Sequence, residues 1–212
     1  MTNLVLIRHG ESIFNQQRTI QGHLDNGLST TGHMQAQLLA KRLAQSGVQP
    51  GAIYTSPLLR AKETTGYLEK TFNFPAIEIN GLMEMGLGVW EGKNIEDIKR
   101  ANETLLASWL NDPSQTAIDG AENFSDFLKR VKEAFSSIIG SHGNEGREII
   151  VVAHGGVLGT FICHSLEIPF RNIWSLKIDN ASINRLVFHR DRAYLTCLND
   201  VGHLNGKKDY ES

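Results

Sequence analysis

The chain has little cysteine, no long apolar run and no excess charge of one sign. Its 212 residues include two cysteines, Cys163 and Cys197, both in apolar surroundings. A disulfide framework is thereby excluded, and we interpret both as buried, inert thiols. No apolar stretch approaches the roughly 18 residues of a membrane span, so we expect no membrane partner. The first residues lack the basic segment of a signal peptide, and we expect a cytoplasmic location.

The charge balance argues against a nucleic-acid partner. The formal net charge is -2, and no basic cluster stands out along the chain. Hydrophobic residues make up 41% and charged residues 21%, as in ordinary globular domains. A site for an anion must therefore be local, built from a few arginine and histidine side chains.

Short apolar runs alternate with amphipathic segments. We expect strands near 4–7, 52–55, 77–79, 149–153, 183–189 and 193–198, and helices near 31–46, 56–72, 94–110, 124–139 and 157–166. Ser29 or Thr30 can cap the first helix, and Ser56-Pro57 is a strong start for the second. The remaining long stretch, 10–28, is predicted to be a loop that is either functional or disordered, as loops of this length usually are.

This alternation predicts an α/β fold: one three-layer α/β/α sandwich with a mostly parallel sheet, formed by a single domain over residues 1–212. The least regular part, about 75–120, is predicted to be a helical insertion over the sheet.

Two of the predicted strands end in the same dipeptide. His9-Gly10 follows the first strand, and His154-Gly155 follows the strand at 149–153. Ligands of open α/β sheets bind beyond the carboxyl ends of the strands, so both histidines should emerge in one crevice. The helix after Gly156 offers free N–H groups, which suit an anion.

Two arginines are placed to join the histidines. Arg8 precedes His9, and Arg60 lies near the start of a helix, with Thr64 one turn later on the same face. A guanidinium matches the oxygens of a phosphate. Taken singly, each histidine is more often a structural residue and Arg60 a surface ion-pair residue. Together they favour an anion site.

The ordered set of motifs resembles the histidine phosphatase superfamily, which has the phosphoglycerate-mutase-like fold. The resemblance extends from residue 4 to about 204. The matching motifs are Arg8-His9-Gly10-Glu11, Asn15, Gln21-Gly22, Leu28-Ser29 with Gly32 and Gln35-Ala36, Thr55-Ser56-Pro57-Leu58 with Arg60 and Thr64, Gly88 with Trp90-Glu91-Gly92, and His154-Gly155-Gly156.

The resemblance implies a phosphatase that works through a phosphohistidine. His9 would be the nucleophile, neutral and with its other nitrogen donating to a backbone carbonyl. Glu84 would protonate the leaving alkoxide and then activate water. The groups that would hold the transferring phosphoryl are Arg8, Arg60, His154 and the N–H of Gly155. The entrance would be lined by Asn15, Gln21 and Gly22, and Glu11 would be an orienting group.

No metal or cofactor is expected, because the chain has no H-E-x-x-H and no Cys/His cluster. The resemblance implies a small phosphorylated metabolite as the partner and allows a homodimer. The short segment after Glu84 favours hydrolysis over mutase activity, because a short lid excludes water less well.

Residues 179–182 and His203 resemble the metal-independent phosphoserine phosphatases, in which a C-terminal histidine helps to bind the substrate carboxylate. Phosphoserine is therefore the predicted substrate. A broad-specificity phosphatase, a phosphoglycerate mutase and a non-catalytic phospho-ligand module remain as alternatives. In one departure, Gly86 stands where many members have an acidic residue.

Overall fold

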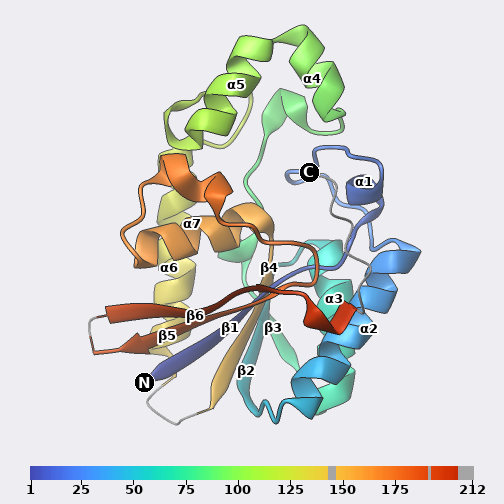
Figure 1. Ribbon diagram of the computed structural model, residues 1–212, viewed down its shortest axis with the longest axis vertical. Coiled ribbons are helices and arrows are strands. Elements are labelled where there is room, and N and C mark those ends of the chain that lie inside the picture. The colour runs from blue at the N-terminus through green and yellow to red at the C-terminus, as the bar shows by residue number, and fades with distance from the viewer. Residues whose placement is uncertain (143–146, 191, 205–212) are drawn as a thin grey trace.

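A computed structural model describes residues 1–142, 147–190 and 192–204. Six strands form one sheet in the order β3-β2-β4-β1-β5-β6 (Figure 1). The strands are β1 (Thr2–Arg8), β2 (Pro50–Thr55), β3 (Ala76–Glu78), β4 (Glu148–Ala153), β5 (Ile183–His189) and β6 (Arg192–Asp200). β3, β2, β4 and β1 are parallel, whereas β5 runs antiparallel to β1, and β6 to β5. The predicted, mostly parallel sheet is confirmed.

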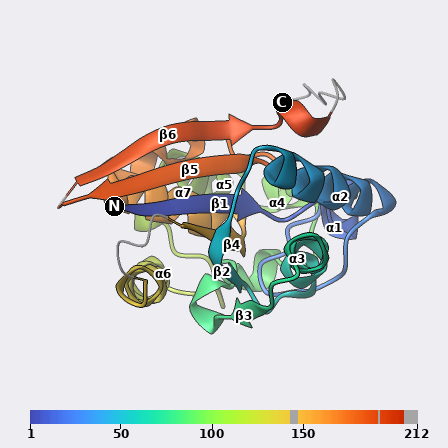
Figure 2. The same cartoon turned by 90° about the horizontal axis from the view of Figure 1, so that it is seen from below.

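Helices cover both faces of this sheet (Figure 2). Val5 and Ile7 of β1 pack in one apolar cluster with side chains of α2 (Thr30–Gln45) and α3 (Leu59–Phe72). Leu4 and Leu6 pack in the other with α6 (Phe124–Gly140) and α7 (Gly155–Ser165). Since alternate residues of a strand point to opposite faces, each central strand serves two cores. The predicted three layers are confirmed.

Two helix boundaries differ from the prediction. α3 begins at Leu59, not after Ser56, because the Ser56 hydroxyl is bonded to His154 and the N–H of Leu59 donates to the carboxylate of Asp25. The expected helix over 94–110 is two helices, α4 (Ile95–Ala101) and α5 (Glu103–Asn111). Asn102 separates them: its N–H ends α4, and its side chain accepts from Leu105 to start α5.

Other local predictions have clear outcomes. Ser29 caps α2, since its hydroxyl accepts from the N–H of Gly32 at 3.0 Å. The expected loop 10–28 contains a short helix, α1 (Ile13–Gln16). Cys163 is buried, and burial raises the pKa of its thiol to about 11, whereas Cys197 is only half-buried.

The segment after β3 extends beyond the carboxyl ends of β1 and β4, where α4 and α5 lie at the far end of the molecule (Figure 1). It also holds the 3-10 turns η1 (Asn80–Leu82), η2 (Gly88–Trp90) and η3 (Pro113–Gln115). Two further turns, η4 (Phe170–Ser175) and η5 (Gly202–Leu204), follow α7 and β6. Within the described part of the chain, no helix combines the length and apolar character that a bilayer crossing requires.

The turn after β1 packs directly on the start of α2. A Cβ added to Gly32 would lie 1.9 Å from the backbone oxygen of Glu11, and one on Gly10 would lie 2.7 Å from the backbone oxygen of Gly32. Backbone atoms cannot swing away as side-chain ends can, so both positions require glycine. This contact holds the turn that follows His9 against the start of α2.

We expect Gly32→Ala to lower the free energy of unfolding by about 2 kcal/mol, within the range for overpacked interiors. Gly66→Ala is the matched control, because it lies inside α3 with nothing within 4 Å of the added Cβ. Alanine there should raise stability by about 0.5–1 kcal/mol. Urea unfolding measures both, and equal stability of Gly32→Ala and the parent chain would contradict the close approach.

Candidate active site

The two strand-end histidines lie side by side, as predicted. β1 and β4 are neighbours with Arg8 opposite Ala153, and the N–H of His9 donates to the Ala153 carbonyl at 3.0 Å. The ring centroids of His9 and His154 are 5.1 Å apart, and both side chains are buried. The register of one strand pair therefore brings together residues 145 positions apart in the sequence.

The hydrogen bond of His9 determines its tautomer. Nδ1 lies 2.7 Å from the carbonyl oxygen of Gly10, which can only accept, so Nδ1 carries the proton and Nε2 the lone pair. Burial, followed by the positive charges of Arg60 and Arg8, holds the pKa of His9 well below its usual value, although the Gly10 bond opposes this. The imidazole is therefore neutral at neutral pH, the form that a nucleophile requires.

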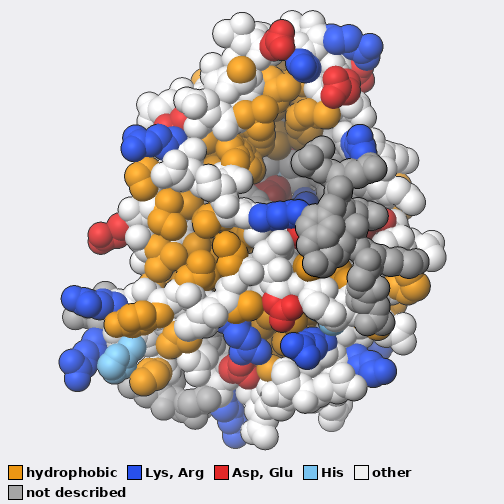
Figure 3. Space-filling model, viewed as in Figure 1, with side chains coloured by type: hydrophobic (Ala, Val, Ile, Leu, Met, Phe, Trp, Pro, Cys, Tyr) orange, Lys and Arg blue, Asp and Glu red, His pale blue; other side chains and the backbone are white. Residues whose placement is uncertain are grey.

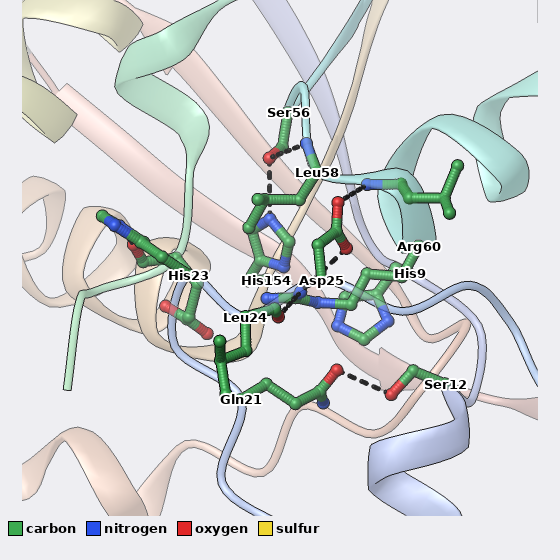
Figure 4. A network of polar contacts seen from close by, with 12 residues as sticks. His9, Ser12, Gln21, His23, Leu24, Asp25, Ser56, Leu58, Arg60 and His154 are labelled. Atoms are coloured by element: carbon green, nitrogen blue, oxygen red, sulfur yellow. Dashed lines mark hydrogen bonds and ion pairs between the residues drawn. The ribbon is translucent and has the colours of Figure 1, made fainter. Parts of the chain in front are cut away.

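His154 has a different partner. Its Nε2 lies 2.8 Å from the hydroxyl of Ser56, which also accepts from the N–H of Leu58 (Figure 4). Burial, followed by Arg60 and His9, lowers the pKa of His154 well below its usual value. Its Nδ1 is buried and has no hydrogen-bond partner among the described residues. When the Ser56 hydroxyl donates to Nε2, Nδ1 carries a proton for an acceptor.

Arg60 is almost completely buried, with 1% of its surface exposed. Its terminal nitrogens donate to the carbonyls of Leu24 and Gly22 at 3.1 and 2.9 Å, and Nη1 lies 3.3 Å from Asp25 (Figure 4). These acceptors hold the guanidinium in one orientation. Thr64, one turn later on α3, accepts from the N–H of Gly10 at 3.0 Å, so α3 is tied to the first histidine turn.

Arg8 projects from the end of β1, where its Nη1 donates to the carbonyl of Ile178 at 2.7 Å. The Nε atoms of Arg8 and Arg60 are buried without an acceptor among the described residues, as is Nδ1 of His154. Leaving a buried donor unpaired costs about 1–3 kcal/mol, so such groups are rare in proteins. Trp109 Nε1 and Thr160 Oγ1, on the lining of the same cavity, are also buried without a partner among the described residues. This gathering of unpaired polar atoms indicates a ligand with several acceptor atoms.

Glu84 is held at the start of α7. One carboxylate oxygen accepts from the N–H of Met85 at 3.0 Å and the other from the N–H of Gly156 at 3.1 Å. Its charge acts on both Arg8 and Arg60. A Cβ on Gly156 would lie 2.5 Å from the carboxylate, so the glycine admits Glu84 to this position.

Two amides at the entrance are oriented by neighbouring side chains: Ser12, which sequence reasoning missed, and Asn180, which lies in the segment 179–182 that it singled out. Ser12 donates to Oε1 of Gln21 at 2.8 Å, and Asn180 donates to Oδ1 of Asn15 at 3.2 Å. Because the amide oxygens are engaged, the NH₂ groups remain for a ligand. The pairing Ser12-x-x-Asn15, a capping box of α1, was the available signal.

A cavity of about 430 Å³ joins these groups. Eight of the predicted site residues line it: Arg8, His9, Asn15, Gln21, Gly22, Arg60, Glu84 and Gly155. In Figure 3, hydrophobic side chains gather over the α5 end of this face, beside a hollow that holds acidic and basic side chains. No cluster of three or more metal-ligating side chains occurs within 1–142, 147–190 and 192–204.

Three predicted residues are not among those that line the cavity. His154 lies directly beside the ring of His9. Glu11 serves the fold, since its carboxylate accepts from Ser29 at 2.5 Å at the start of α2. His203 is buried in η5, which packs on α2, so the structure does not bring it to the cavity.

Sequence reasoning also missed an apolar wall opposite the histidines. Its aromatic members are Trp109, Phe124, Phe127 and Trp174, and its aliphatic members include Ile20, Met85, Leu87, Ile173 and Leu176. The aromatic members and Ile173 come from α5, α6 and η4, and the other aliphatic members come from the loops after α1, η1 and η4. The only available signal was the apolar spacing of those segments, which predicts core equally well.

The fold and the cavity define an α/β protein with a histidine-centred anion site. The family model described as the histidine phosphatase superfamily (branch 1) matches residues 4–201, and the chain belongs to that superfamily.

Three relatives place the chain within it. The chain is 30% identical to the putative phosphoserine phosphatase 2 of Hydrogenobacter thermophilus, over 96% of this chain and 98% of that one. It is 29% identical to a probable phosphoglycerate mutase of Serratia proteamaculans, over 97% and 96% of the two chains. Its structure is similar to that of a mycobacterial glucosyl-3-phosphoglycerate phosphatase in complex with VO3, with a TM-score of 0.86, 29% identity, and 94% and 99% coverage.

Burial of the neutral His9 imidazole makes stability depend on pH. Its pKa is 6.5 in an unfolded chain and well below that in the folded one, so the unfolded chain takes up the proton first. The stabilisation is therefore complete above 6.5 and is lost as the pH falls from 6.5 towards the depressed folded pKa. We expect His9→Asn to flatten this fall by up to about 1.4 kcal/mol per pH unit.

The measurement is urea unfolding of both proteins between neutral pH and the acid limit of folding. His189→Asn is the control, because His189 lies on the exposed end of β5. If His9→Asn and the parent chain lose stability with the same slope, the His9 imidazole is not held neutral by burial.

Proposed function

We propose that this chain hydrolyses small phosphomonoesters through a phosphohistidine at His9. The observation that carries the proposal is the pair of buried Nε donors on Arg8 and Arg60, which have no acceptor among the described residues, with Nδ1 of His154 near them and a neutral imidazole whose Nε2 holds a lone pair. A phosphoryl group supplies the acceptor oxygens, and its phosphorus is the electrophile that such a nitrogen attacks.

In the first step, Nε2 of His9 forms a bond to phosphorus while the ester P–O bond breaks. Glu84 donates a proton to the departing alkoxide, which leaves as the alcohol. The guanidiniums, His154 and the N–H groups at the start of α7 bind the equatorial oxygens, where charge is spread in the transition state. The Gly10 carbonyl stabilises the charge that the imidazole acquires.

In the second step, a water molecule attacks phosphorus opposite Nε2. Glu84, now ionised, takes a proton from that water, and the P–N bond breaks to release phosphate and neutral His9. The contacts of Glu84 with the Met85 and Gly156 N–H groups hold its carboxyl group beside the cavity, where both steps take place.

The sequence resemblance and the Hydrogenobacter relative's name support phosphoserine as a substrate. Broad specificity remains an alternative. Chain length does not separate hydrolysis from mutase activity, because the Serratia relative is almost the same length. Conversion of 3- to 2-phosphoglycerate that exceeds phosphate release would favour the mutase, and phosphate binding without turnover would favour the binding module.

We expect the chain to hydrolyse p-nitrophenyl phosphate in EDTA, and His9→Ala to lower kcat by about 10³-fold or more, because the nucleophile is lost. The matched control is His189→Ala, which replaces an exposed histidine and should leave kcat unchanged. Denatured wild-type enzyme quenched during turnover should carry an acid-labile phosphate. Turnover by His9→Ala at the wild-type rate would rule out the phosphohistidine.

Replacement of the proposed acid and base should affect the two steps differently. With p-nitrophenyl phosphate, whose leaving group needs no proton, Glu84→Gln should release one burst of nitrophenolate and then stall as the phosphoenzyme. With ethyl phosphate, its turnover should fall by about 10²-fold or more without a burst. Stopped-flow absorbance measures the burst, and wild-type turnover of both esters by Glu84→Gln would remove Glu84 from the mechanism.

A further inference from the structure

The cavity has two unlike halves. The phosphate half consists of charged and polar groups on the ends of β1, β4, α3 and α7, as described above. The opposite half is the apolar wall, with Trp109, Phe124 and Trp174 as its largest side chains. In-line attack by Nε2 of His9 places the ester oxygen, and the alcohol part beyond it, on the side of phosphorus away from His9.

The aromatic side chains of the wall hold one another in place. The rings of Trp90 and Trp109 meet edge to face at 5.6 Å, and those of Trp109 and Trp174 lie 4.6 Å apart. The indole N–H of Trp174 donates to the carbonyl of Trp109 at 3.3 Å, which joins η4 to α5. The aromatic side chains of the wall are therefore held in a defined arrangement by contacts with one another.

Trp174 has 44% of its surface exposed although it lies on the cavity. A tryptophan left this open gains free energy when a ligand covers it, since burial of apolar area and ring contacts are both favourable. A cavity with mostly apolar walls and a few placed polar groups is the usual form of a site for an apolar organic ligand.

The same wall disfavours an amino acid as the alcohol part. The cations that line the cavity are Arg8, Arg60 and Lys177 within the described residues, and the two arginines belong to the phosphate half. Nζ of Lys177 lies 3.6 Å from the carboxylate of Asp179. Apart from the amides of Asn15 and Gln21 at the entrance, most of the remaining lining is apolar. A carboxylate and an ammonium that face its indole and phenyl rings would lose water without gaining a charged partner, and unpaired charges are costly to desolvate.

We propose that the preferred substrates are phosphomonoesters with an apolar, aromatic alcohol part, which the wall of Trp109, Phe124 and Trp174 binds, and not phosphoserine. This inference rests on the proposed function and names its substrate class. Trp174 is the specificity-determining residue, because it is the large, open side chain of the wall.

The test compares kcat/KM for three alkyl esters, 2-phenylethyl phosphate, ethyl phosphate and O-phosphoserine, so that leaving-group reactivity differs little. We expect the phenylethyl ester to exceed both others by about tenfold or more, the discrimination that a few buried apolar groups supply. Trp174→Ala should lower kcat/KM for the phenylethyl ester by about tenfold and change that for ethyl phosphate by less than about twofold.

Tyr194→Ala is the matched control: Tyr194 is 47% exposed, like Trp174, but lies on β6 outside the cavity. It should leave all three values unchanged. A higher kcat/KM for phosphoserine than for the phenylethyl ester would overturn the inference, as would an equal loss on all three esters in Trp174→Ala. Either result leaves the hydrolase proposal intact, whereas failure of every ester to turn over would defeat the hydrolase itself.

Discussion

The parallel pairing of β1 with β4 is the constraint on which the site depends. It places Arg8 opposite Ala153 and lets the N–H of His9 bond to the Ala153 carbonyl. Side chains alternate along a strand, so a slip of one residue would turn one imidazole to the other face of the sheet. The apolar runs of both strands are buried on two faces, and this burial enforces the register that brings the rings to 5.1 Å.

The site holds buried N–H groups without acceptors. Arg60 is buried with its terminal nitrogens bonded, and its Nε and that of Arg8 have no acceptor among the described residues. Such groups cost stability in the free protein, and the surrounding fold tolerates that cost because large cores lie on both faces of the sheet. In the proposed function the same groups are preorganised for a phosphoryl group, so no reorganisation is needed when charge develops on its oxygens.

In the proposed function, chemistry and specificity are carried by different parts of the chain. The phosphate half is formed by strand ends and helix starts of the sheet, where backbone hydrogen bonds fix each side chain. The apolar wall is formed by α5, α6 and η4, which pack on one another through rings such as Trp109 and Trp174. Changes in the wall can therefore alter the alcohol part that fits without disturbing the geometry around His9.

The sequence by itself determined the strands, the sandwich and the convergence of His9 with His154. Buried apolar runs and their alternation with amphipathic segments can be recognised locally, and parallel strands then bring their carboxyl ends to one edge of the sheet. It also located the cap at Ser29. It did not determine the start of α3, since the carboxylate that meets the N–H of Leu59 belongs to Asp25, 34 residues earlier. Nor did it separate α4 from α5. Asparagine can occur inside a helix, and only the structure shows that the side chain of Asn102 accepts from the N–H of Leu105 and so starts a new helix. The position of His203 away from the cavity and the assembly of the aromatic wall were decided by tertiary structure alone. The sequence does not distinguish an apolar side chain that packs in a core from one that lines a cavity. Only the packing of elements that are distant in the sequence decides between the two.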